Sequence, residues 1–269
     1  MSDVIPVSVE WLSLREDADA RSRSRSLARK AVRMTRAPVV VHDLGSGTGS
    51  MMRWLAPRLP GPQTWVLHDW NHALLDHAAQ RASDSTGHRA AVRTSVRDVA
   101  ELSDGDLAGA SLVTMSALLD VLTIEETETV VRACVAAGAP VLFTLTVTGR
   151  VELEPVDPGD RVFESAFNDH QRRTADGRRL LGPDAVSTVI NVFASAGWTV
   201  RVDESPWRLD DSAPALVGEW LEGWVAAAVE ARPTLEEWAE EYLQTRRSQL
   251  ADGTLRVVVH HQDLLAWPT

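Results

Sequence analysis

Glycines and carboxylates are the residues of this sequence whose spacing suggests chemistry. Residues 43–49 read DLGSGTG, a glycine-rich stretch between a β-branched apolar run and a helical pattern. Glycine lets the backbone turn tightly and approach a ligand closely, and the following helix presents free N–H groups. The stretch differs from the G-x-G-x-x-G dinucleotide fingerprint, because the third glycine comes one residue early, at Gly49, and Ser50 stands in its place. Asp43 would repel a phosphate at this loop but would tolerate a cationic ligand.

Two further carboxylates stand at the ends of predicted strands. Asp69 ends the second apolar run and could accept hydrogen bonds from both hydroxyls of a ribose. Asp98 follows the third run and could accept a hydrogen bond from an exocyclic adenine amine. A glycine loop with two such acids outlines a site for an adenosine without phosphates. Each acid alone also has a structural interpretation, since Asp43 could cap the following turn and Asp69 could cap the helix from Asn71 onward.

These segments resemble, in order, four motifs of the class I S-adenosylmethionine (SAM)-dependent methyltransferases. The matching stretches are residues 41–49, 66–69, 97–99 and 111–122. The resemblance implies SAM as the cofactor, contacted by Asp43, Gly45, Ser46, Gly47, Gly49, Asp69, Trp70, Asp98, Val99, Met115 and Ser116. It implies that the glycines line the methionine part and that Asp69 holds the ribose. Trp70 would pack on the adenine and Asp98 would bind its amine, while Met115 and Ser116 would lie beside the sulfonium.

Composition and charge narrow the choice of partner. The 269 residues carry a net charge of -11, so we expect no nucleic-acid partner. Methyltransferases that act on base amines carry an Asn/Asp-Pro-Pro-aromatic turn after the fourth strand, and residues 115–120 lack it. The single cysteine, Cys134, lies in an apolar helical stretch and is expected to be a buried structural thiol. It allows no intramolecular disulfide and no cysteine-based zinc site, and we expect no metal.

The chain shows no sign of export or membrane insertion. Its amino terminus lacks a basic region followed by an apolar run, so no signal peptide is predicted. No stretch reaches the ~18 consecutive apolar residues that a membrane span needs. We therefore expect a cytoplasmic protein without a membrane partner.

Strand and helix patterns alternate along the chain. Strands are predicted at residues 39–44, 64–69, 90–96, 111–115, 141–147, 198–202 and 254–261. Helices are predicted at residues 11–36, 51–59, 73–82, 125–137, 183–196 and 213–250, the last broken at Pro233. This order predicts an α/β, Rossmann-like, seven-stranded doubly wound sheet with helices on both faces. Residues 1–37 would form an N-terminal helical segment or lid. Residues 38–269 would form the methyltransferase domain, with a helical insert at about 205–252 before the last strand.

Three regions are candidates for the substrate side. Asp120 follows the fourth predicted strand and could face the methyl group, or it could cap the turn into the next helix. Residues 157–181 are polar and are predicted to be a loop or lid, in which His170 could act as a base or orient a substrate. Five arginines surround it, at Arg161, Arg172, Arg173, Arg178 and Arg179. They could grip an anionic group or form a solvated face.

The helical insert is rich in tryptophan. Trp220 and Trp224 are four residues apart and should share one helix face. They could pack the insert onto the core, cover a flat substrate or form a subunit interface.

Taken together, the motifs predict an enzyme that transfers a methyl group from SAM to a small-molecule acceptor by SN2 displacement. A non-catalytic SAM-binding regulator or scaffold is the alternative from another class. A nicotinamide-dependent oxidoreductase is a third, and the early third glycine and Asp43 argue against it. The acceptor atom, the natural substrate and the oligomeric state stay open at this point.

Overall fold

The sheet is the centre of the molecule. The computed structural model describes residues 7–85 and 90–269. Within them an eight-stranded sheet has the order β3-β2-β1-β4-β5-β10-β8, with β9 paired to β10. The strands are β1 Val39–Leu44, β2 Gln63–Asp69, β3 Ala90–Val96, β4 Leu112–Ser116, β5 Val141–Glu154, β8 Trp198–Glu204, β9 Trp207–Leu209 and β10 Arg256–Pro268. The first five are parallel in the pairs that they form with one another, and β10 is antiparallel to both β5 and β8.

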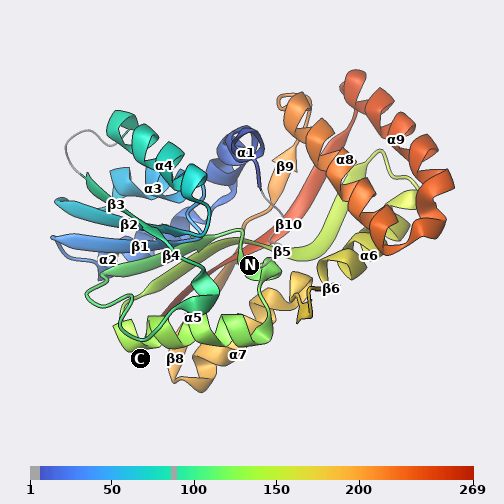
Figure 1. Ribbon diagram of the computed structural model, residues 1–269. Helices are drawn as coiled ribbons and strands as arrows, with labels where there is room; N and C mark the ends of the chain where they lie inside the picture. The colour runs from blue at the N-terminus through green and yellow to red at the C-terminus, as the bar shows by residue number, and fades with distance from the viewer. Residues whose placement is uncertain (1–6, 86–89) are drawn as a thin grey trace.

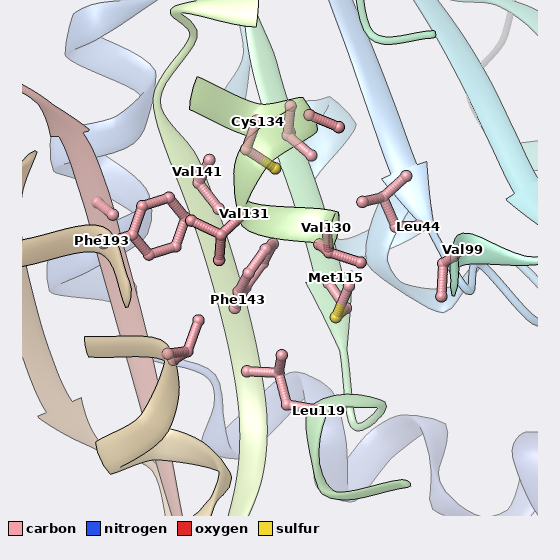
Figure 2. Packing of buried hydrophobic residues seen from close by; sticks show 14 of the residues in the cluster. Leu44, Val99, Met115, Leu119, Val130, Val131, Cys134, Val141, Phe143 and Phe193 are labelled. Carbon is pink, nitrogen blue, oxygen red and sulfur yellow. The ribbon is translucent and has the colours of Figure 1, made fainter. Parts of the chain in front are cut away.

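Helices cover both faces of this sheet, as Figure 1 shows. On one face lie α2 (Arg25–Met34), α3 (Ser50–Leu55) and α4 (His72–Ser85), whose apolar side chains pack against β1 and β2. On the other lie α5 (Ile124–Ala137) and α7 (Ala185–Ser195). Figure 2 shows this second layer, in which Met115 and Phe143 of neighbouring strands pack near Val130 of α5 and Phe193 of α7. The predicted fold class is confirmed.

Local sequence signals explain where α5 begins and ends. The Thr123 hydroxyl accepts a hydrogen bond from the Glu126 main chain, and the Glu126 carboxylate accepts one from the Thr123 N–H, which makes a capping box. Gly138 ends the helix with φ 66°, a left-handed conformation that glycine adopts without a Cβ clash. These caps set the position of the turn that leads from β4 into α5.

A second core extends the sheet at one end. The far halves of β5 and β10 reach beyond the parallel strands, and α6 (Gly159–Gln171), α8 (Pro214–Ala231) and α9 (Glu236–Ala251) pack against them. Figure 1 shows these three helices together at the right of the molecule. In this core the buried Tyr242 hydroxyl donates a 2.7 Å hydrogen bond to Asp160, which also pairs with the buried Arg246. The insert is therefore part of a continuous packed body with β5 and β10.

Two predictions of secondary structure were wrong. The single helix at residues 11–36 is two helices, α1 (Val9–Ser22) and α2, with a break at Arg23 and Ser24. Ser24 makes the break because its hydroxyl caps α2 by accepting a hydrogen bond from Leu27 N, and its N–H donates to Asp263 of β10 at 2.6 Å. Residues 1–6 of the predicted N-terminal segment lie outside the described residues.

The predicted loop at residues 157–181 contains α6 and a short hairpin of β6 (Thr174–Ala175) and β7 (Arg178–Arg179). The helix forms because Phe163 and Ala166 give it an apolar stripe that packs on α8. The many polar residues of the segment hide this stripe when only composition is considered. In addition, β5 runs on to Glu154, and β9 had no counterpart in the prediction.

In the described part of the chain, no helix combines the length and the hydropathy needed to cross a membrane.

Candidate active site

A cavity of about 520 Å³ lies where the parallel strands end. Residues at the carboxyl ends of β1, β2 and β4, or shortly after β1, β2 and β3, form its floor, and they include Asp43, Gly45, Ser46, Gly47, Asp69, Trp70, Asp98, Val99 and Ser116. The opposite wall comes from α1 and from the α6–hairpin segment, with Trp11, Leu12, Arg15, Asp19, Phe167, Arg173, Arg178 and Leu180. Ligands of open α/β sheets bind at this edge, beyond the carboxyl ends of the strands.

The glycine loop approaches the cavity through a conformation that side chains resist. Gly45 and Gly47 have φ values of 61° and 52°, in the left-handed region. A Cβ on Gly45 would lie 2.4 Å from a side-chain carbon of Leu118, so a larger residue would push into the β4–α5 turn. Gly49 is also left-handed and begins α3, but it is not among the residues that line the cavity.

Asp69 links two of the predicted motifs. One of its oxygens accepts a hydrogen bond from Gly47 N at 2.8 Å, and the other accepts one from Asn71 N at 2.9 Å. Asn71 caps the next helix, since its side-chain oxygen accepts from Ala73 N at 3.0 Å. The cap that the sequence allowed for Asp69 therefore belongs to Asn71. Burial raises the pKa of Asp69, and its two main-chain hydrogen bonds oppose that shift.

Asp43 is a buried carboxylate with an unused oxygen. Its side chain is 1% exposed, and Oδ1 accepts a 2.7 Å hydrogen bond from the Thr114 hydroxyl of β4. Oδ2 has no hydrogen-bond partner among the described residues. Burial raises the pKa of Asp43 to about 7, against the opposing effect of the Thr114 hydrogen bond. Because Asp43 lines the cavity, a cationic group there would stabilise its ionised form.

Arg23 is a buried cation that the sequence did not single out. It lies at the break between α1 and α2, and its Nη2 donates to the hydroxyls of Ser50 and Ser116 at 3.1 and 3.0 Å. Its Nε and Nη1 have no hydrogen-bond partner in the described structure, and its nearest ion pair, with Asp19, is long at 3.9 Å. The pKa of Arg23 is lowered, chiefly because burial penalises its charged form. Both serines line the cavity, so Arg23 lies directly behind its wall.

The outer part of the floor is less enclosed. Asp98 uses one oxygen to accept a 2.9 Å hydrogen bond from Ala100 N, at the start of the short helix Val99–Glu101. Trp70 lines the cavity and is 44% exposed. Met115 lies in the core under α5, 1% exposed, and does not line the cavity.

The two predicted catalytic residues are not among those that line the cavity. Asp120 lies in the short helix Leu119–Val121; burial raises its pKa, and the charge of Arg15 opposes that shift. His170 lies on α6, where Nε2 is 3.2 Å from Glu230 on α8 and Nδ1 is 3.3 Å from Arg173. Burial and then the Arg173 charge lower the pKa of His170. The fold directs this imidazole to the α6–α8 contact.

Helix α1 is fastened across the cavity by ion pairs. Glu16 accepts two hydrogen bonds from Arg53 of α3, at 2.6 and 2.7 Å, and one from Arg81 of α4 at 3.0 Å. On its other side, Asp19 pairs with Arg15 at 3.1 Å and accepts a 3.0 Å hydrogen bond from Trp207 Nε1. The Glu16 and Trp207 contacts hold α1 beside the cavity, whose lining includes Trp11, Leu12 and Arg15.

The tryptophans of the insert belong to its core. Trp220 and Trp224 stack at a centroid distance of 5.3 Å, and both are buried against α6 and α9. Their predicted common face is confirmed, and it packs the insert. Across residues 7–85 and 90–269, no group of three His, Cys, Asp or Glu side chains is placed to hold a metal ion.

Comparisons with known proteins agree with this site. A family model described as a methyltransferase domain matches residues 41–140, which span the glycine loop, Asp69, Asp98 and the β4–α5 turn. No curated protein sequence matches the chain significantly.

Solved structures of the same fold cover nearly the whole chain. The cyclopropane synthase MmaA2 from Mycobacterium tuberculosis is 13% identical, with a TM-score of 0.52 over 97% of this chain and 94% of that one. The YcgJ protein from Bacillus subtilis is 12% identical, with a TM-score of 0.52 over 90% and 97%. A SAM-dependent methyltransferase from Geobacter sulfurreducens, solved with S-adenosyl-L-homocysteine (SAH), is 15% identical, with a TM-score of 0.50 over 99% and 100%. The chain is therefore similar to a methyltransferase domain over residues 41–140, and over nearly its whole length it has the fold that these structures share.

Proposed function

We propose that this protein binds SAM in the cavity and transfers its methyl group to a small-molecule acceptor. The observation that carries the proposal is a pair of buried groups with unused hydrogen-bonding capacity, Asp43 Oδ2 and the Nε and Nη1 of Arg23. The methionine end of SAM carries an ammonium and a carboxylate, which match these two groups in charge. Buried polar atoms usually have hydrogen-bond partners, so a ligand of this kind would explain why these three atoms are left without one.

The remaining floor fits the rest of SAM. Left-handed glycines at the loop leave room for a ligand to approach the backbone. Each oxygen of Asp69 accepts one main-chain N–H and keeps a lone pair that a ribose hydroxyl could use. Asp98 keeps one free oxygen for an adenine amine, and the exposed ring of Trp70 offers a stacking surface. The Geobacter protein, solved with SAH, supports this assignment by its fold.

The part of the cavity that would hold the methyl acceptor would act by excluding water and by aligning the acceptor with the methyl group. SAM supplies a methyl group on a positively charged sulfur. The apolar side chains of Leu118, Val121 and Phe167 would keep water out, and α1 would close the cavity above them. Holding an acceptor atom in line with the carbon–sulfur bond can supply much of the rate enhancement without a base. His170 and Asp120 stay candidates to position groups from behind the wall.

The acidic surface supports a small molecule as the acceptor. With a net charge of -11, the protein should repel nucleic acid. We place its action in the cytoplasm, as the sequence predicts.

Ligand-dependent thermal stability tests the proposal. SAM or SAH at 100 times its dissociation constant should stabilise the folded protein by about 2.7 kcal/mol, and NAD should not. The same measurement separates a methyltransferase from a nicotinamide-dependent enzyme. The absence of any shift with millimolar SAM and SAH would reject the proposal. A shift without turnover of any acceptor would instead favour the non-catalytic regulator.

A further inference from the structure

The arginines that line the cavity differ in whether they form an ion pair with a carboxylate. Among the described residues, Arg15 pairs with Asp19, Arg97 with Asp106 and Arg178 with Glu126. Arg173 lines the same cavity and has no carboxylate within ion-pair distance in the described structure. The chain has 38 Asp and Glu against 27 Lys and Arg, so a cavity arginine without a direct ion pair to a carboxylate is a departure from its surroundings.

Two nearby arginines, Arg172 and Arg178, show how a carboxylate would bind to Arg173. Arg172 holds Asp184 with Nε and Nη2 at 2.7 and 2.9 Å, and Arg178 holds Glu126 with Nε and Nη2 at 2.7 Å each. Nε and Nη2 lie on one edge of the guanidinium, and this edge matches the two oxygens of a carboxylate. The same edge of Arg173 makes no hydrogen bond to the described residues, since only its Nη1 is engaged, with His170.

The position of Arg173 is fixed before any ligand arrives. Its main-chain N–H donates to His170 O at 3.1 Å, and its carbonyl accepts from Leu180 N at 3.2 Å across the β6–β7 hairpin. Its Nη1 donates to the same His170 carbonyl at 3.0 Å. A guanidinium held in this way loses little conformational entropy when it binds a ligand. His170 would therefore act on the substrate through Arg173.

The surroundings of Arg173 favour an organic anion. Beside the charged Arg173 and Arg178, the cavity lining contains the apolar side chains of Phe167, Ala175, Leu180 and Leu122. Charges interact strongly beside such a surface. On the proposed function the sulfonium adds a second positive charge to the cavity, and an anion between the two cations would relieve their repulsion. We propose that the methyl acceptor is a small carboxylic acid with an apolar body, whose carboxylate is bound side-on by Arg173.

This proposal rests on the proposed function, and the experiment separates the two. Wild-type protein saturated with SAH is titrated with benzoate, phenylacetate and hexanoate and with the three matching amides, each up to about 20 mM, by calorimetry. At least one acid should bind about tenfold more tightly than its amide. In Arg173→Ala this preference should disappear, and Arg173→Lys should restore only part of it because an ammonium lacks the side-on edge.

Arg172→Ala is the matched control, because its partner Asp184 lies outside the cavity lining. It should keep the preference for the acid. All variants should bind SAH as the wild type does, which also shows that they are folded. Failure of SAH to bind would reject the proposed function itself. With SAH bound, acids that bind no better than amides, or an unchanged preference in Arg173→Ala, would overturn the role of Arg173.

Discussion

The main-chain N–H of Gly47 donates a 2.8 Å hydrogen bond to Oδ2 of Asp69, which ties the glycine loop after β1 to the end of β2. Asp69 thus shapes the loop as well as offering acceptors to a ligand. The predicted motifs at residues 41–49 and 66–69 are therefore joined by a direct hydrogen bond in this structure. A change at Asp69 should therefore affect both the glycine loop and the end of β2 in the proposed SAM site.

We expect Asp69→Ala to weaken SAH binding by roughly 1–3 kcal/mol, because the ribose loses a charged acceptor and Gly47 loses its anchor. Asp69→Asn keeps one oxygen and should lose less. Calorimetry gives the affinity, and thermal unfolding shows whether the fold persists. Asp104→Ala removes an exposed carboxylate and is the control. Wild-type affinity in a folded Asp69→Ala protein would contradict the assignment.

Arg23 should discriminate between ligands that do and do not carry the methionine carboxylate. We expect Arg23→Met to lower SAH affinity by about 10- to 100-fold, since hydrogen bonds to charged groups contribute roughly 1.5–3 kcal/mol. Affinity for 5′-methylthioadenosine, which lacks that carboxylate, should stay the same. Calorimetry with both ligands measures the difference. Arg21→Met, an exposed position on the same helix, is the control. Equal losses for both ligands would place Arg23 outside the carboxylate site.

Asp43 should make SAH binding depend on pH. Its pKa is about 7 in the folded protein and 3.8 ordinarily, so between these values the folded state holds more protons than the unfolded state. Its ionisation therefore lowers stability as pH rises through that window. A bound ammonium favours the ionised form, so SAH should release a proton on binding and bind more tightly as pH rises from about 5.5 to about 7.5.

Calorimetry in two buffers of different ionisation enthalpy counts this proton. Asp43→Asn should bind SAH more weakly and should not release it. The Thr114 hydrogen bond can persist in this variant, because an amide oxygen also accepts. Proton release of the same size in Asp43→Asn would assign the titration to another group.

Glu16 should control how quickly the cofactor leaves. Its ion pairs fasten α1 to α3 and α4, so Glu16→Gln should speed SAH dissociation, by about tenfold if roughly 1.4 kcal/mol of closure is lost. Burial raises the pKa of Glu16, but the Arg53 and Arg81 contacts outweigh it and lower the pKa. The contribution of Glu16 to stability is thus present above pH 4.5 and is lost as pH falls through the lower folded value.

Stopped-flow fluorescence can follow this dissociation, since Trp11 and Trp70 line the cavity. Glu10→Gln, on the exposed side of α1, should leave the rate unchanged. An unchanged rate in Glu16→Gln would show that α1 does not govern exchange of the cofactor.

Sequence reasoning found the floor of the cavity because its signals are local. Asp69 ends a strand, and Gly45, Gly47 and Asp98 each follow one; parallel strands bring their carboxyl ends together whatever the rest of the chain does. Arg23 could not be found in this way. It stands in an Arg–Ser alternation that resembles a solvated segment, and only its packing against Ser50 and Ser116 marks it.

The cavity residues of the segment that contains α6 and the β6–β7 hairpin were harder to predict, because no local signal marks them. His170 was expected in a polar loop or lid, but it lies on α6 and contacts Glu230, which is 60 residues later on α8. Arg173, three residues on, lines the cavity because the helix has ended and the hairpin turns the chain. Which side chain of a polar segment meets a cavity depends on helix phase and on distant contacts, and neither is visible in local composition.

The position of β10 has a consequence for how the protein is made. It is the last strand along the chain, yet it lies between β5 and β8 and bonds to both. On the ribosome, β1 to β5 can assemble as soon as they emerge, whereas β8 must wait for β10 before it can join them. Until then the edge of β5 is open to other chains. Synthesis of residues 155–268, between the end of β5 and the end of β10, should therefore be the stage at which the nascent protein most needs a chaperone.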